Sequence, residues 1–192
     1  GVPSGLETSI GMKLGHLIHL DGAGGGPAAV INLVHGFRNN GHSQVVFHGG
    51  QGRISESCAS LNVKTIQLPI DKKWKIPFGL WVLVFALWRE QVDVLVLHGQ
   101  WGGPVGAIAA WLTGTKTIYV THWPAFYTDW TPWRTFRNAV AEWLPCRIAR
   151  RVVALTPSVY YQYFFRGWAE EGKLALIPNP CDFEHLPTQE DV

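Results

Sequence analysis

The sequence predicts an α/β fold: a Rossmann-like three-layer α/β/α sandwich with a mostly parallel sheet. Short apolar runs alternate with longer segments of helical periodicity, and such alternation leads to right-handed crossovers between parallel strands. The runs at 92–97, 117–121 and 151–155 are almost continuously apolar, as expected of strands whose two faces are both covered by helices. A chain of 192 residues is long enough to give one such domain a sizeable core.

Strands are expected where apolar residues form short runs bounded by turn residues. These runs are 14–20, 44–48, 63–68, 92–97, 117–121, 151–155 and 173–177. The segments between them have helical spacing, apart from an aromatic loop at 123–132. They are 27–39, 55–61, 77–89, 103–113, 133–150 and 158–168. The first helix has Pro27 in its first turn and ends before Asn40-Gly41, and Ser158 is the expected N-cap of the last.

The chain divides into a tail at 1–11, one domain at 12–178 and the start of an interdomain linker at 179–192. Met12 is the only methionine and immediately precedes the first strand. It fits the start of translation, and an ordinary N-terminal extension explains residues 1–11 equally well. The small and polar residues before Met12 do not have the pattern of a signal peptide.

Composition excludes several classes of protein. A net charge of +2 is too small to indicate a nucleic-acid partner. Three cysteines, with no C-x-x-C spacing, argue against a disulfide framework or a zinc knuckle. These are Cys58, Cys146 and Cys181. Such cysteine usage fits a reducing compartment, so we expect a cytoplasmic protein.

One apolar segment, 77–88, is flanked by basic residues: Lys72, Lys73 and Lys75 before it and Arg89 after it. It is shorter than the roughly 20 residues that a membrane span needs. The segment fits a buried crossover helix, and it also fits a helix lying on an anionic membrane surface. Arginines clustered at 134–151 fit a solvated helix face, acidic lipid head groups or a phosphorylated acceptor. The lipid interpretation predicts a peripheral location at the inner face of the membrane.

Ligands of doubly wound sheets bind at the carboxyl ends of the strands. The first strand is followed there by a glycine-rich loop that includes Gly24, Gly25 and Gly26 and runs into Pro27. Consecutive glycines allow a ligand to approach the backbone, and the N-terminus of the next helix suits a phosphate. A tight strand-to-helix turn would also need small residues. A nicotinamide site is disfavoured, because Pro27 occupies the third glycine position and no carboxylate ends the second strand. A P-loop is excluded by the absence of G-K-[ST].

Two histidines follow successive strands: His98 after the fourth and His122, preceded by Thr121, after the fifth. They are expected in one cleft, where a histidine can hydrogen-bond a sugar hydroxyl or a phosphate. No third ligand has suitable spacing for a metal, and no G-x-S-x-G elbow supports a serine nucleophile. His16 and His19 on the first strand are expected to be ordinary sheet or cleft residues.

These motifs, in their order and spacing, resemble the N-terminal domain of glycosyltransferase family 4 over about residues 12–186. The family's D-V-x-x-x-H-G element is matched at 93–99, its T-H element at 121–122, and its G-H-x-V element approximately at 41–45. Its closing P-N-G-x-D is matched at 178–182, where Asn179 and Asp182 are present and Pro180 replaces the glycine. Trp123 follows His122 where a glycine is common.

The resemblance implies the N-terminal, acceptor-side half of a GT-B fold, with the C-terminal donor domain missing. It implies a transferase that moves a hexosyl unit from a nucleotide sugar to a hydroxyl acceptor, such as a glycan, a lipid-linked sugar or a small molecule. Retention of configuration and no obligatory metal or other cofactor are implied too. His122 would lie beside the reacting sugar, and the donor phosphates or acceptor would meet Gly24, Gly25, Gly26, His98, Thr121, Asn179 and Asp182. The alternatives are a fragment of a sugar-nucleotide epimerase and a non-catalytic module that binds a sugar, a nucleotide or a partner.

Overall fold

The computed structural model describes residues 11–19, 25–50, 52–122 and 131–178. The described part contains one sheet of seven strands, all parallel, in the order β3-β2-β1-β4-β5-β6-β7. The strands are β1 (Lys13–Ile18), β2 (Ser43–His48), β3 (Lys64–Gln67), β4 (Val94–His98), β5 (Lys116–Thr121), β6 (Arg151–Ala154) and β7 (Leu174–Leu176). The predicted parallel α/β sheet is therefore confirmed, and the strand ends differ from the predicted ones by only a residue or two.

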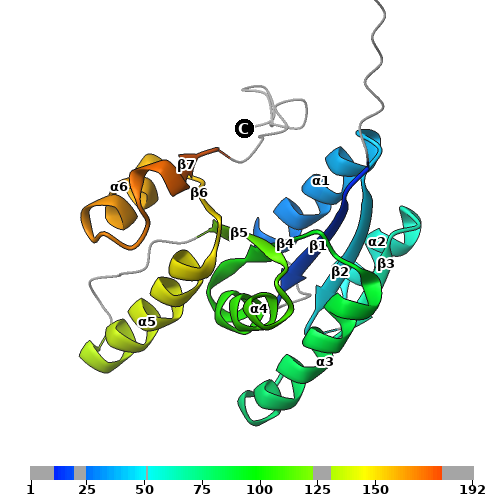
Figure 1. Ribbon diagram of the computed structural model, residues 1–192, viewed down its shortest axis with the longest axis horizontal. Coiled ribbons are helices and arrows are strands. Elements are labelled where there is room, and N and C mark those ends of the chain that lie inside the picture. Colours follow the sequence, from blue (N-terminus) through cyan, green and yellow to red (C-terminus); the bar gives the residue numbers. More distant parts are fainter. Residues whose placement is uncertain (1–10, 20–24, 51, 123–130, 179–192) are drawn as a thin grey trace, which may run out of the picture.

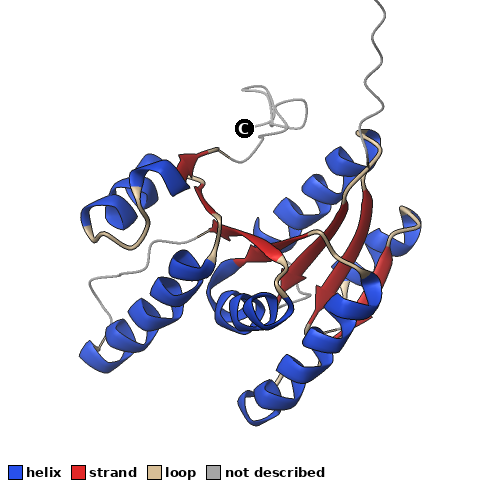
Figure 2. Ribbon diagram, in the orientation of Figure 1, coloured by secondary structure: helices blue, strands red, loops and turns tan. Residues whose placement is uncertain are grey.

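Helices cover both faces of the sheet, as the predicted three-layer sandwich requires (Figures 1 and 2). On one face lie α1 (Gly25–Asn39) and α2 (Arg53–Ser60). On the other lie α3 (Ile76–Glu90), α4 (Gly99–Thr113) and α5 (Pro132–Ile148), with α4 packed between its two neighbours, and α6 (Pro157–Phe165) continues this layer. Two short 3-10 turns, Lys73–Lys75 and Glu171–Lys173, precede α3 and β7.

Each face of the sheet has its own hydrophobic core. The larger core lies under α3, α4, α5 and α6 and includes Leu17, Leu95 and Leu97. The smaller core lies under α1 and α2 and includes Ile18 and Val46. Adjacent residues of β1 thus contribute to opposite cores, as side chains that alternate along a strand must do.

Helix α4 begins at Gly99, four residues earlier than predicted, because close packing overrides the weak helical preference of its glycines. A Cβ atom at Gly106 would lie 2.3 Å from Leu97 Cδ2 and 2.5 Å from Leu17 Cδ2. Any larger residue would force these two leucine side chains to shift, so glycine favours the close packing of α4 on the sheet. His98 is both the last residue of β4 and the N-cap residue of α4.

The last helix also starts differently from the prediction. Thr156, not Ser158, is the N-cap of α6, and its hydroxyl oxygen accepts a hydrogen bond from the backbone N–H of Val159 at 3.3 Å. Pro157 follows in the first helical position, where its missing N–H costs nothing. The helix ends at Phe165, three residues before the predicted end.

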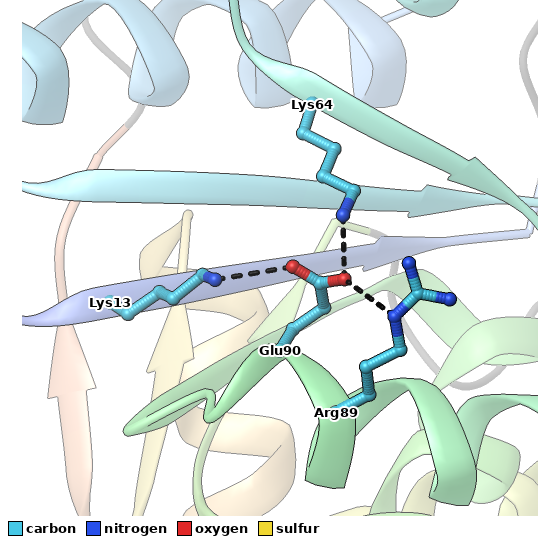
Figure 3. A network of polar contacts seen from close by, with 4 residues as sticks. All are labelled: Lys13, Lys64, Arg89 and Glu90. Atoms are coloured by element: carbon cyan, nitrogen blue, oxygen red, sulfur yellow. Dashed lines mark hydrogen bonds and ion pairs between the residues drawn. The ribbon is translucent and has the colours of Figure 1, made fainter.

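A charged cluster holds the amino edge of the sheet together (Figure 3). The Glu90 carboxylate at the end of α3 accepts hydrogen bonds from Lys64 Nζ at 2.6 Å and Lys13 Nζ at 3.2 Å, and Arg89 Nε lies 3.8 Å away. The hydrogen bond from Lys64, followed by that from Lys13, lowers the pKa of Glu90. Since Lys13 and Lys64 begin their strands, the cluster lies at the edge opposite the carboxyl ends, and its role is structural.

A buried polar cluster joins β5, α5 and α6 on the opposite side of the molecule from α1. The hydroxyls of Tyr119 and Tyr163 both donate short hydrogen bonds to the Glu142 carboxylate, and Tyr163 also bonds the hydroxyl of Thr121 at 3.0 Å. Burial raises the pKa of Glu142 to about 7, although the two tyrosine hydrogen bonds act in the opposite direction. The cluster anchors the end of β5, directly before His122.

Replacement of Glu142 tests this cluster. Glu142→Leu leaves the buried Tyr119 hydroxyl without its acceptor and leaves Tyr163 with Thr121 as its partner, and it is expected to lower the free energy of unfolding by about 2 to 4 kcal/mol. Glu142→Gln keeps an acceptor oxygen and is expected to cost less. Chemical denaturation at pH 5, 7 and 8 measures both effects.

The same measurement tests the protonation of Glu142. Because its folded-state pKa is about 7 and the unfolded value is 4.5, its contribution is present below pH 4.5 and lost as the pH rises through 7. The difference in unfolding free energy between wild type and Glu142→Gln is therefore expected to shift by about 2 to 3 kcal/mol against wild type between pH 5 and pH 8. A difference that stays constant across this range would contradict a raised pKa.

Candidate active site

The candidate site lies at the carboxyl edge of the sheet, where β1 and β4 are neighbours and the strand order reverses. The last residue of β1, Ile18, pairs with His48 of β2 on one side and His98 of β4 on the other. Helix α1 leaves toward one face of the sheet and α4 toward the other. Open α/β sheets bind their ligands in the crevice that forms at such a point.

Three histidines meet here, on the face covered by α1: two from the adjacent strands β1 and β4, and one that directly follows β5. His98 points to this face because Leu95 and Leu97 point into the larger core, and His122 follows Thr121, which bonds Tyr163 on the other side. His16 Nδ1 lies 3.4 Å from His98 Nε2, and His98 Nδ1 lies 3.4 Å from His122 Nε2. The predicted meeting of His98 and His122 is therefore observed, and His16 joins them as a third member.

These histidines are neutral at pH 7 because they are buried. Burial lowers the pKa of His16 to about 4, although the hydrogen bond with Gln44 acts in the opposite direction. Burial, followed by the neighbouring His16 and His122, holds the pKa of His98 well below 6.5, and burial lowers that of His122. Within the described part of the chain, no three His, Cys, Asp or Glu side chains are arranged to hold a metal ion.

Gln44 of β2 closes the inner end of this row of histidines. Its side-chain oxygen lies 3.1 Å from His16 Nε2, and its nitrogen donates a 2.7 Å hydrogen bond to the backbone oxygen of Val34 in α1. The Phe37 ring of α1 lies 6.0 Å from the His16 ring. Gln44 was not predicted as a site residue from the sequence, and His16 was expected to be an ordinary sheet or cleft residue. The alternation of side chains along a strand could have identified His16. It places His16 on the same face of β1 as Ile18, the last residue of the strand, next to the predicted binding site.

The glycine-rich loop leads into α1, which begins at Gly25, two residues before the predicted start. A Cβ atom at Gly25 would meet nothing within 4 Å, and at Gly26 it would meet only Ile18 Cδ1, at 3.8 Å. Packing within the chain therefore does not require glycine at these two positions. Helix α1 is the next described element after β1, so its N-terminus lies at the carboxyl edge of the sheet, where we expected a phosphate.

A second aromatic group lies beside this edge and was not anticipated from the sequence. The Trp101 ring at the start of α4 is partly exposed, 6.5 Å from the His19 ring, and the Arg137 guanidinium of α5 lies 5.0 Å from it. Burial lowers the pKa of His19. The predicted site residues Gly24, Asn179 and Asp182 lie outside the described residues, as does Trp123.

Comparisons with solved structures show the same architecture. HepE of Anabaena in complex with UDP-glucose has a TM-score of 0.74 at 17% identity, covering 90% of this chain and 45% of its own. The lipopolysaccharide outer core galactosyltransferase WaaB has a TM-score of 0.64 at 16% identity, with coverages of 94% and 50%. A candidate UDP-N-acetylglucosamine 2-epimerase from Listeria monocytogenes has a TM-score of 0.65 at 11% identity, with coverages of 85% and 44%.

The chain thus spans about half the length of each of these structures. At such low identities the similarity establishes the fold alone. No curated protein matches the sequence. The profile of Glycosyltransferase Family 4, by contrast, matches residues 23–185, which include the row of histidines from His98 to His122 and the start of α1. With most of its length matched by this profile and with the fold of one half of a GT-B protein, the chain belongs to Glycosyltransferase Family 4.

Proposed function

We propose that this chain is the acceptor-side half of a glycosyltransferase that moves a hexosyl unit from a nucleotide sugar to a hydroxyl acceptor. The observation that carries the proposal is the contact between His98 and His122 at the point where the strand order reverses, in a chain of this family. HepE, which shares the fold, was solved with UDP-glucose, and WaaB is a galactosyltransferase. Both support a nucleotide-activated hexose as donor. The acceptor classes remain a glycan, a lipid-linked sugar or a small molecule.

Each part of the site has a role in this reaction. His122 lies beside the reacting sugar, where a neutral imidazole exchanges hydrogen bonds with hydroxyl groups. The N-terminus of α1 and the glycines before it face the negative charge that develops on the departing diphosphate. Asn179 and Asp182 belong to the segment that leads toward the donor domain. The reaction proceeds with retention and without an obligatory metal.

In this proposal the donor domain makes most of the binding contacts with the nucleotide sugar. Holding the donor and acceptor in register accounts for a large part of such catalysis. An active enzyme therefore needs a C-terminal domain facing the carboxyl edge of this sheet.

An epimerase half is the alternative that a specific observation favours, since the candidate epimerase from Listeria monocytogenes shares this fold. The two reactions differ in their products. A transferase consumes an acceptor hydroxyl and releases a nucleoside diphosphate, whereas an epimerase changes the sugar without net release of the nucleotide. A module that binds without chemistry would do neither.

We propose further that the outer faces of α3, α4 and α5 rest on an anionic membrane surface at the inner face of the membrane. Aromatic and aliphatic side chains occur at the same 3-4-3 spacing on two of these helices and leave large areas exposed. They are Phe78, Trp81, Phe85 and Trp88 on α3 and Trp133, Phe136, Val140 and Trp143 on α5, with Trp111 on α4 between them. Trp81 is 64% exposed and Trp133 71%. Helix α3 is thus the predicted crossover helix on its inner side and an exposed aromatic face on its outer side.

The charges on these three helices favour the same surface. Their exposed charged side chains are all basic, namely Arg89, Arg134 and Arg147, whereas both acidic residues, Glu90 and Glu142, are buried. Aromatic rings beside cationic groups suit the head-group region of an anionic bilayer. In the described residues no helix is both long enough and apolar enough to cross a bilayer.

The isolated residues 1–192 are expected to release little or no UDP from UDP-glucose, because they span about half the length of the related structures and in this proposal the other half holds the donor. The assay measures UDP release with a panel of hydroxyl acceptors present. Robust release by the chain alone would contradict the proposal that it is only the acceptor-side half.

In the two-domain enzyme, His122→Ala is expected to lower kcat by about 10²-fold or more, a typical loss when one preorganised hydrogen-bonding group is removed from the reacting centre. Nucleotide release and sugar transfer are measured together. His35→Ala, at an exposed position on α1, is the matched control and is expected to be silent. Formation of an epimer without an acceptor and without UDP release would favour the epimerase.

Sedimentation with vesicles tests the membrane surface. The chain is expected to bind vesicles that contain phosphatidylglycerol and not vesicles of phosphatidylcholine alone. The double change Arg89→Glu and Arg134→Glu should weaken binding more than about tenfold, since each basic residue near an anionic surface contributes about 1 kcal/mol. Arg53→Glu on α2, at the opposite face of the sheet, is the control, and the losses are compared per reversed charge. An equal loss per reversed charge, or equal binding to charged and uncharged vesicles, would contradict the proposal.

A further inference from the structure

We propose that Gln44, His16 and His98 form a positioning chain that holds His122 in a single tautomer, with hydrogen on Nε2 and a free electron pair on Nδ1. The four side chains come from β2, β1, β4 and the position directly after β5, and they are linked by three contacts of 3.1 to 3.4 Å. The inference rests on the proposed function only for what His122 acts on. The tautomer itself follows from the hydrogen-bond geometry.

Gln44 fixes the donor-to-acceptor direction of the hydrogen bonds in the positioning chain. The backbone oxygen of Val34 can only accept a hydrogen bond, so the Gln44 atom 2.7 Å from it must be the amide nitrogen. The Gln44 oxygen is thereby turned toward His16. Because an amide oxygen can only accept, His16 must carry its hydrogen on Nε2.

This polarity then passes from ring to ring. A neutral imidazole has one donor and one acceptor nitrogen, and His16 and His98 are both buried and neutral at pH 7. With hydrogen on Nε2, His16 offers Nδ1 as an acceptor to His98 Nε2. His98 in turn offers Nδ1 to His122 Nε2. All three histidines therefore carry hydrogen on Nε2, and Nδ1 of His122 is left as the acceptor at the outer end.

The chain is not a proton conduit. If His122 Nδ1 takes up a proton, a shift of the Nε2 hydrogens inward would leave the positive charge on His98 or His16, and burial lowers the pKa of both. Beyond His16 no transfer is possible, because the Gln44 amide oxygen is a hydrogen-bond acceptor and not a base. The positioning chain therefore does not lead a proton away from the site, and it acts by orientation.

The orientation selects among the ligand groups that we considered for His122. A free electron pair on Nδ1 accepts a hydrogen bond from a hydroxyl group. It has nothing to donate to a fully ionised phosphate oxygen. Within the proposed function, His122 therefore contacts a hydroxyl of a sugar or acceptor, and the diphosphate is met elsewhere.

Long-range ¹H–¹⁵N NMR spectra of the imidazole rings at pH 7 test the tautomers directly and require no turnover. The three histidines of the chain are expected to show a protonated Nε2 and an unprotonated Nδ1. His48 provides an internal reference for a protonated Nδ1, because this atom lies 2.5 Å from the backbone oxygen of Gly50 and must carry hydrogen. A wild-type spectrum in which His122 populates both tautomers, or carries hydrogen only on Nδ1, would overturn the inference.

Two changes at His16 separate positioning from packing. His16→Gln can still donate to Gln44 and accept from His98, so His98 and His122 are expected to keep their tautomers. His16→Leu removes the link, and both rings are expected to become mixtures of two tautomers that change together, while His48 is unaffected. Gln44→Met, which removes the inner acceptor, should have the same effect and serves if His16→Leu does not fold. An unchanged His122 spectrum in the folded apolar variants would contradict the positioning role.

Activity of the two-domain enzyme provides a separate readout. His16→Leu is expected to lower kcat at least tenfold, with His16→Gln restoring most of the loss. If the tautomers change as expected but no sugar-transfer activity exists in wild type, the proposed function fails and the positioning chain stands. If the tautomers do not change, the positioning chain fails whatever the activity is.

Discussion

The parallel pairing of β1 with β4 is the constraint on which the rest of this structure depends. It joins the strand that leads into α1 to the strand that leads into α4, and these helices leave toward opposite faces. The pairing therefore sets the point at which the strand order reverses, where open α/β sheets bind their ligands. It also sets the register in which the side chain of His16, two residues before the end of β1, contacts that of His98 at the end of β4. A slip of one residue would turn every side chain of the strand to the other face and would disperse the histidines.

Buried polar groups occur near both edges of the sheet, but they differ in their charge state. At the amino edge the Glu90 carboxylate remains charged because two lysines donate hydrogen bonds to it. Near the carboxyl edge, burial instead favours neutral groups: the histidines lose affinity for protons, and Glu142 gains it. A row of neutral imidazoles can have a defined donor and acceptor direction, which a row of charged ones would not have.

The outer faces of α3 and α5 expose aromatic and basic side chains. Helix α3 serves two environments, since Leu83 and Leu87 enter the core while Trp81 and Trp88 face outward. The apolar residues of α3 therefore occur on both its core-facing and its exposed side, and hydrophobicity alone does not tell the two sides apart. On α3 and α5 the two acidic residues point inward and arginines remain outside, which makes the exposed face basic although the net charge of the whole chain is only +2.

The sequence by itself determined the element order, the parallel α/β class, the family resemblance and the placement of His98 and His122 at the ends of neighbouring strands. These features follow from local periodicity and from short motifs, because the period of apolar residues reports the element type directly. The start of α4 was mispredicted because the glycines around Gly102 look like a loop until the sheet packs against Gly106.

Only the tertiary structure decided that His16 and Gln44 join the site, that Glu142 is shared by two tyrosines, and that the aromatic residues of α3 and α5 lie on one outer layer. The residues that form hydrogen bonds with one another in the histidine row and in the Glu142 cluster are 21 to 82 positions apart in the sequence. Such contacts depend on strand order and register, which periodicity within one segment does not encode.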